Sequence, residues 1–132
     1  MKIFDCFQYF DEDMMLDLRL HVLDKYVDEF IIVENLYMHS GKKKERNFNI
    51  KNFQKFKNKI RYILVDELPK NLVSLENLSG SKKTNSLIDN TLKIEHNQRN
   101  KILDGLNDAK KDDLILISDV DEIPKLENIK DK

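Results

Sequence analysis

Apolar residues gather in short runs along the chain, and polar segments separate these runs. Residues 2–7, 28–34 and 59–65 are rich in β-branched and aromatic side chains without strict polar alternation, as is typical of strands covered on both faces. A fourth run, residues 114–117 (LILI), is fully apolar and ends directly before an acidic segment. We predict that these four runs form one mostly parallel sheet.

Helical periodicity appears between the predicted strands. Leu16, Leu20 and Leu23 fall on one face of a helix that follows the first strand, and residues 94–109 carry a second apolar stripe at helical spacing. Residues 47–58 favour a shorter helix before the third strand. Strands that alternate with helices predict an α/β fold, in which ligands bind beyond the carboxyl ends of the strands.

The organisation of the chain is that of one domain. A length of 132 residues suits a single core, and we predict one domain over residues 1–132. Residues 71–93 include the polar cluster NLSGSKKTNS and little periodicity. We therefore predict a surface loop or lid over residues 71–93.

Charge and composition exclude several classes of partner. The chain has 23 basic and 24 acidic residues, for a net charge of −1, so no overall field favours nucleic acid or an anionic membrane. Cys6 is the single cysteine, which rules out an intrachain disulfide. The sequence shows neither a leader-like segment nor an apolar run of membrane-spanning length. We expect a cytoplasmic protein without a membrane span.

The chemistry of the chain centres on Asp119 and Asp121. These carboxylates directly follow the fourth predicted strand, where concentrated negative charge requires a compensating cation or proton. Mn²⁺ and Mg²⁺ prefer oxygen ligands, and Mg²⁺ commonly uses one or two carboxylates together with substrate phosphates. A solvated acidic turn is the alternative interpretation, and for an isolated D-x-D motif it is the more common one.

The neighbouring segments add specificity to this motif. SDVDEIP is preceded, in order, by DCFQYFDEDMMLDLRL, VDEFIIVENLYMHSGKKK, EHNQRN and the strand start at Asp112 and Asp113. Together these segments resemble glycosyltransferase family 17, which includes the bisecting β-1,4-N-acetylglucosaminyltransferases. The resemblance spans nearly the whole chain and about the first half of such enzymes. It therefore implies a fold that is incomplete at the carboxyl terminus, with the catalytic base beyond the D-x-D motif.

The resemblance implies a GT-A fold, a Rossmann-type sheet flanked by helices, with the first and fourth strands adjacent. It implies Asp119 and Asp121 as ligands of Mn²⁺ or Mg²⁺, and inverting transfer of N-acetylglucosamine from a UDP-sugar to a glycan acceptor. Phe7 and Gln8 would then face Asp119 across the crevice. Glu34 would reach the base or ribose. Arg99 would approach the diphosphate or hold the D-x-D carboxylates.

Two other functions remain as alternatives. One is a non-catalytic remnant, or a fragment that requires a partner, because the strand edge that later elements would cover is expected to be open and to favour a homodimer or a partner chain. The other is a haloacid-dehalogenase-type phosphatase, since ILISDVDE resembles a strand followed by a nucleophile and an acid. That family carries its D-x-D motif on the first strand, which argues against the second alternative.

Overall fold

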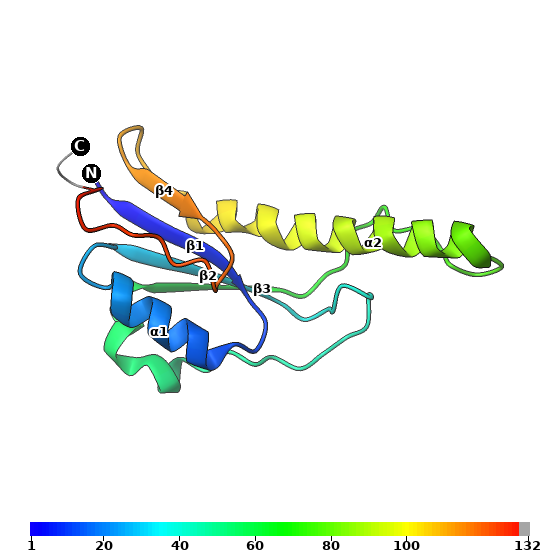
Figure 1. Cartoon of the computed structure of the whole chain (residues 1–132), viewed down its shortest axis with the longest axis horizontal. Helices are drawn as coiled ribbons and strands as arrows, with labels where there is room; N and C mark the ends of the chain where they lie inside the picture. Colours follow the sequence, from blue (N-terminus) through cyan, green and yellow to red (C-terminus); the bar gives the residue numbers. More distant parts are fainter. Residues whose placement is uncertain (130–132) are drawn as a thin grey trace.

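The computed structural model describes residues 1–129, which form a four-stranded sheet with helical elements on both faces (Figure 1). The strands are β1 (Ile3–Tyr9), β2 (Glu29–Asn35), β3 (Ile60–Val65) and β4 (Leu114–Ile117). The α-helices are α1 (Asp13–Leu23) and α2 (Gly80–Asn100), and the 3₁₀ segments are η1 (Ile50–Lys59) and η2 (Lys101–Gly105). The predicted α/β class and all four predicted strands are confirmed.

The sheet has the strand order β3-β2-β1-β4, and every pair is parallel. Cys6 of β1 is in register with Ile31 of β2 on one side and with Ile117 of β4 on the other. The chain therefore builds outward from β1 to β3 and then returns to the opposite side of β1. The adjacency of the first and fourth strands is confirmed. Such a reversal in strand order is where α/β sheets commonly bind ligands.

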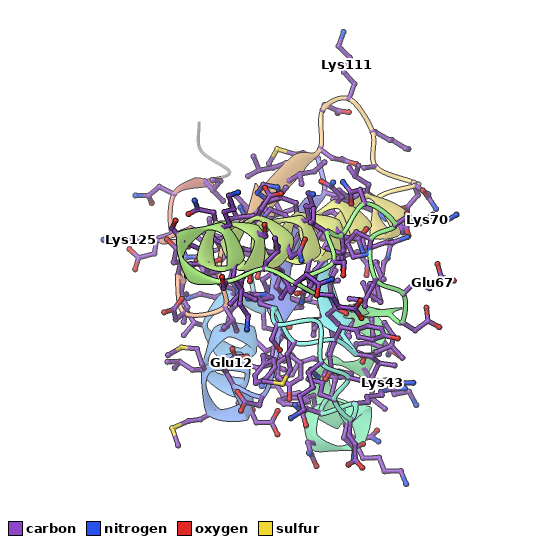
Figure 2. The ribbon with its side chains drawn as sticks, turned by 90° about the vertical axis from the view of Figure 1, so that its right-hand side faces the viewer. Glu12, Lys43, Glu67, Lys70, Lys111 and Lys125 are labelled. Carbon is purple, nitrogen blue, oxygen red and sulfur yellow. The ribbon has the colours of Figure 1, made fainter. Side chains whose placement is uncertain are left out.

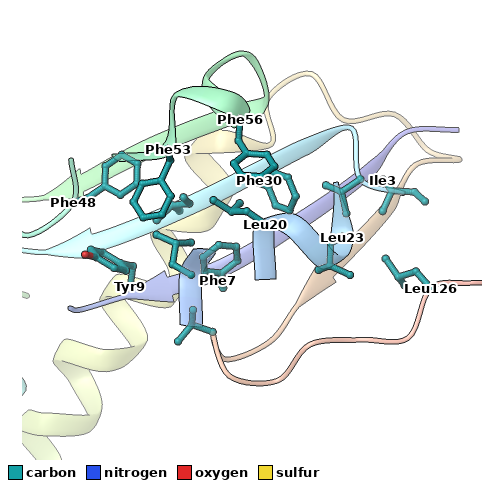
Figure 3. Packing of buried hydrophobic residues seen from close by; sticks show 14 residues of the cluster. Ile3, Phe7, Tyr9, Leu20, Leu23, Phe30, Phe48, Phe53, Phe56 and Leu126 are labelled. Carbon is teal, nitrogen blue, oxygen red and sulfur yellow. The ribbon is translucent and has the colours of Figure 1, made fainter. Parts of the chain in front are cut away.

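The larger core lies on the face of the sheet that carries α1 and η1. Leu16, Leu20 and Leu23 of α1 are fully buried there, as their helical spacing predicted. They meet aromatic and aliphatic side chains from the strands and from η1 (Figure 3). Phe7 belongs to this core and is 0% exposed. The expectation that Phe7 faces the crevice is wrong, because alternation along β1 turns its ring into the core and leaves Gln8 on the opposite face.

The opposite face is covered by η2 and the last part of α2. Phe4, Cys6, Ile31 and Val33 point to this side and pack with Ile102. The helix predicted over residues 94–109 is divided here, because α2 ends at Asn100 and a 3₁₀ turn continues to Gly105. At Gly105 the chain lies so close to the sheet that an added Cβ would stand 2.8 Å from Cγ2 of Ile31.

The predicted loop over residues 71–93 is wrong in its second half, since α2 begins at Gly80. Figure 1 shows why periodicity gave no signal: the first half of α2 projects beyond the carboxyl ends of the strands and has no sheet beneath it. Near its middle α2 is tied to the loop that follows β2, where Thr91 Oγ1 donates to the carbonyl of His39 at 3.1 Å. Asn90 likewise exchanges two hydrogen bonds with the backbone of Val73.

Across residues 1–129, no helix combines the length and the apolar character that crossing a bilayer demands.

Candidate functional site

A cavity of about 650 Å³ lies at the carboxyl ends of β1, β2 and β4. Figure 2 views the molecule from this side, with α2 nearly end-on and α1 below it. The volume is in the range that holds a small-molecule ligand. The cavity is lined by Gln8, Tyr9, Phe10, Glu12, Met15, Asn35, Tyr37, Met38, His39, Glu95, Gln98, Asp119, Val120 and Asp121.

Asp119 and Asp121 both line this cavity from the turn that follows β4. The turn is closed by reciprocal bonds, because Glu122 N donates to the Asp119 carbonyl at 2.9 Å and Asp119 N donates to Glu122 Oε1 at 3.0 Å. Both aspartates are exposed, so their carboxylates are open to a ligand. Asp119 and Asp121, the predicted metal ligands, therefore both lie on the wall of the cavity at the carboxyl ends of the strands.

The donor set at this turn suits a hard cation that shares its coordination with substrate. Within residues 1–129, no group of three or more Asp, Glu, His or Cys side chains is arranged to hold a metal by itself. Two carboxylates on an open cavity leave positions for water and for phosphate oxygens, which is how Mg²⁺ is commonly bound. The residues present therefore fit Mn²⁺ or Mg²⁺ at a diphosphate.

Arg19 of α1 fixes the position of this turn from inside the protein. Its side chain is 0% exposed and makes a two-point contact with the carboxylate of Asp5, at 2.8 and 2.7 Å. Nη2 also donates to Ser118 Oγ at 2.6 Å. Nη1 donates to the carbonyls of Asp119 at 2.8 Å, Val120 at 3.2 Å and Glu122 at 2.8 Å. One buried guanidinium thus joins α1, β1 and the acidic turn.

This role of Arg19 escaped the sequence analysis, although a signal was present. Arg19 lies three residues after Leu16 and four before Leu23, on the apolar face of α1. A charged residue on a buried helix face requires a partner of opposite charge. Asp5 in the middle of an apolar strand was a visible candidate for that partner.

Arg99 approaches the acidic turn from α2. Its Nη2 lies 3.8 Å from Asp119 Oδ1 and 3.5 Å from Glu95 Oε1. A second cavity, of about 180 Å³, is lined by Arg99, Asp119, Gln8, Ile102, Ile117, Ser118 and Glu122. Arg99 thus lies near both Glu95 and Asp119, and its position near Asp119 places a cation beside the D-x-D motif.

Three amide side chains meet the large cavity. Gln8 lies near the carboxyl end of β1, as predicted, and lines both cavities. Asn35, the last residue of β2, and Gln98 of α2 are 3% and 5% exposed and were not predicted. Their signal in the sequence was weak, because a polar residue at a strand end or inside a polar helix is unremarkable.

Glu34 lies on the other face of β2 and does not line the large cavity. Its carboxylate is 0% exposed and accepts hydrogen bonds from Lys44 Nζ and Asn47 N at 2.7 Å, Phe48 N at 3.0 Å and the Tyr62 hydroxyl at 2.6 Å. Burial raises the pKa of Glu34, but these donors outweigh burial and the pKa falls below its usual value. In this structure Glu34 orders the segment after β2 rather than facing a ligand.

Comparison with known proteins identifies the family. The profile described as glycosyltransferase family 17 matches residues 1–131, essentially the whole chain. No curated protein and no solved structure gives a significant match. The parallel sheet with its reversal at β1 and β4 agrees with the Rossmann-like GT-A fold expected of a glycosyltransferase. The chain belongs to glycosyltransferase family 17.

Proposed function

We propose that this chain forms the donor-binding part of a metal-dependent glycosyltransferase. The donor is a UDP-sugar, with N-acetylglucosamine as the transferred sugar, and a glycan hydroxyl is the acceptor. Transfer proceeds with inversion at the anomeric carbon. The observation that carries the proposal is the exposure of Asp119 and Asp121 on a cavity of about 650 Å³ at the reversal in strand order.

The charge pattern of the cavity supports a diphosphate ligand bound through a cation. Asp119 and Asp121 would hold Mn²⁺ or Mg²⁺, and the bound ion would neutralise the departing nucleoside diphosphate. Arg99, 3.8 Å from Asp119, adds a positive charge on the same side. Arg19 holds the backbone of the turn, so the carboxylates need little reorganisation to accept the ion.

The remaining task of the site is positioning. Breaking the bond between the anomeric carbon and the diphosphate while an acceptor oxygen attacks from the opposite side requires the two substrates in line. Tyr9, Phe10, Tyr37 and Met38 line the cavity and supply apolar surface for the nucleoside. The general base that takes the acceptor proton is expected beyond Asp121, as the family resemblance implies.

Calorimetric titration tests the donor half directly. UDP, UDP-N-acetylglucosamine and a GDP-sugar are titrated into the protein with and without Mn²⁺, alongside Asp119→Ala and Asp121→Ala. We expect uridine nucleotides to bind only with Mn²⁺ and each variant to lose at least tenfold in affinity, because each removes a metal ligand. Asp112→Ala is the matched control: it removes an exposed acid just before β4, at the opposite end of the strand.

The outcomes separate the proposal from its alternatives. Metal-dependent binding that survives in Asp112→Ala and is lost in both site variants supports a donor site. If the folded protein binds no nucleotide under any of these conditions, the chain is a non-catalytic remnant or a fragment that requires a partner. Equal losses in all three variants would mean a non-specific effect of net charge.

A further inference from the structure

Asn35, which lines the large cavity, has a buried amide N–H group without a hydrogen-bond acceptor. Its Nδ2 is the one buried side-chain nitrogen or oxygen within residues 1–129 that has no hydrogen-bond partner. The other end of the amide is fixed, because Oδ1 accepts a hydrogen bond from Tyr37 N at 2.9 Å. A buried donor without a partner is costly and rare in folded proteins. A ligand in the cavity is the natural acceptor.

Gln98 presents a complementary group to the same cavity. Its Nε2 donates to the carbonyl of Val33 at 3.1 Å, which leaves Oε1 as an acceptor. Val33 and Asn35 are two residues apart on β2 and therefore point to the same face of the sheet. Both amides line the cavity. The cavity lining formed by β2 and α2 thus includes a donor from Asn35 and an acceptor from Gln98.

A protein donor together with a protein acceptor can distinguish nucleobases that carry a keto group from those that carry an amino group. Uracil and guanine carry a carbonyl oxygen next to a ring N–H, so they match a protein donor beside a protein acceptor. Cytosine and adenine carry an amino group next to a bare ring nitrogen, which reverses the pattern. A site built to hydrogen-bond one pattern rejects the other strongly, because the wrong base leaves buried polar groups unpaired.

We infer that Asn35, with Gln98, reads the base edge of the donor and restricts the site to nucleotides with a keto base. The inference rests on the proposed function, in which this cavity binds a nucleoside diphosphate-sugar. Asn35 donates from Nδ2 to the base carbonyl, and Gln98 accepts at Oε1 from the neighbouring ring N–H. Asn35 thereby acts on specificity rather than on the chemical step.

Asn35→Asp tests this assignment with little change in shape. The aspartate keeps an oxygen for Tyr37 N and replaces the donor by an acceptor. Affinities for UDP, CDP and GDP are measured by calorimetry with Mn²⁺. We expect the wild type to favour UDP over CDP, and the variant to reduce the UDP-to-CDP affinity ratio by roughly tenfold or more. The added negative charge weakens both ligands alike because their diphosphates are identical, so the ratio reports the base alone.

Two further variants keep the test decisive. Asn35→Ser keeps a hydroxyl for Tyr37 N, removes the amide without adding charge and is expected to lower the same ratio. Asn97→Asp is the matched control, since Asn97 lines a separate cavity at the end of β3 and its substitution adds the same charge without touching the base edge. The GDP arm shows whether the cavity admits the larger keto base.

The possible results distinguish a failure of this inference from a failure of the proposed function. A wild type that binds UDP and CDP equally, or an Asn35→Asp variant whose ratio is unchanged, overturns the inference. The proposed function survives either result if Asp119→Ala still abolishes Mn²⁺-dependent binding. A folded wild type that binds no nucleotide overturns both.

Discussion

At the scale of single residues, Arg19 does the most to join the interior to the site. Its guanidinium takes the place of water as the hydrogen-bond donor to Asp5. It also donates hydrogen bonds to three carbonyls of the turn that bears the D-x-D motif. The ring of Phe7 lies 4.6 Å from its central carbon. The geometry of the acidic turn therefore depends on a side chain that is fully buried.

Arg19→Met tests this dependence. The substitution leaves Asp5 as a buried charge without its partner and strands the carbonyls of the turn, so we expect the free energy of unfolding to fall by about 3–5 kcal/mol. Chemical denaturation measures the loss. Arg61→Met is the control, because Arg61 pairs with Asp108 and Glu29 in partly exposed positions, where ion pairs contribute little to stability. Similar losses in the two variants would contradict the role assigned to Arg19.

The position of the D-x-D carboxylates was easier to predict from the sequence than that of the residues that support them. Asp119 and Asp121 stand out because two charges directly follow an apolar run, which is a local signal. Arg19 acquires its role from partners far along the chain, such as Ser118, 99 residues away. Phe7 was misplaced because the resemblance marked a neighbourhood, whereas alternation along a strand separates adjacent side chains onto opposite faces.

At the scale of elements, η2 packs closely against the sheet. Gly105 ends η2, and the side chains of Ile31 and Ile63 occupy the space that a Cβ would take, at 2.8 and 3.2 Å. The structure explains why glycine stands at this position: only glycine allows η2 to approach β2 and β3 this closely.

Gly105→Ala should therefore destabilise the fold through overpacking. We expect the free energy of unfolding to fall by about 1–3 kcal/mol, since Ile31 lies in a central strand and cannot move away freely. Leu103→Ala is the control in the same 3₁₀ turn: Leu103 is 66% exposed, and its truncation should change stability by no more than about 0.5 kcal/mol. A neutral Gly105→Ala variant would show that β2 and η2 separate at little cost.

Elements were predictable where they face the sheet and unpredictable where they do not. The buried leucines of α1 repeat at helical spacing because one face of that helix is covered. The first half of α2 projects past the strands and carries exposed residues on most sides (Figure 1), so its composition resembles that of a loop. Apolar residues repeat at helical spacing where one face of a helix is buried, so a helix without a sheet beneath it lacks this periodicity.

At the scale of the whole molecule, strand order creates the site. The pattern of apolar runs gave four strands, but their order came from the family resemblance, because pairing such as Leu114 N with the Lys2 carbonyl joins positions 112 residues apart. The reversal at β1 brings Gln8, Asn35 and the D-x-D turn to one edge of the sheet. Local sequence patterns do not indicate which strands are neighbours in the sheet.

The same strand order leaves β4 at an edge, and self-association is the consequence we expect. Within residues 1–129 no strand pairs with the outer side of β4, and its Ile115 is 39% exposed. Unprotected edges favour pairing with another chain, and a lysine there opposes it. Sedimentation over a dilution series should show a concentration-dependent dimer for the wild type and a monomer for Ile115→Lys. Leu92→Lys, at an exposed position of α2, should still dimerise, whereas a wild type that stays monomeric at every concentration would refute this expectation.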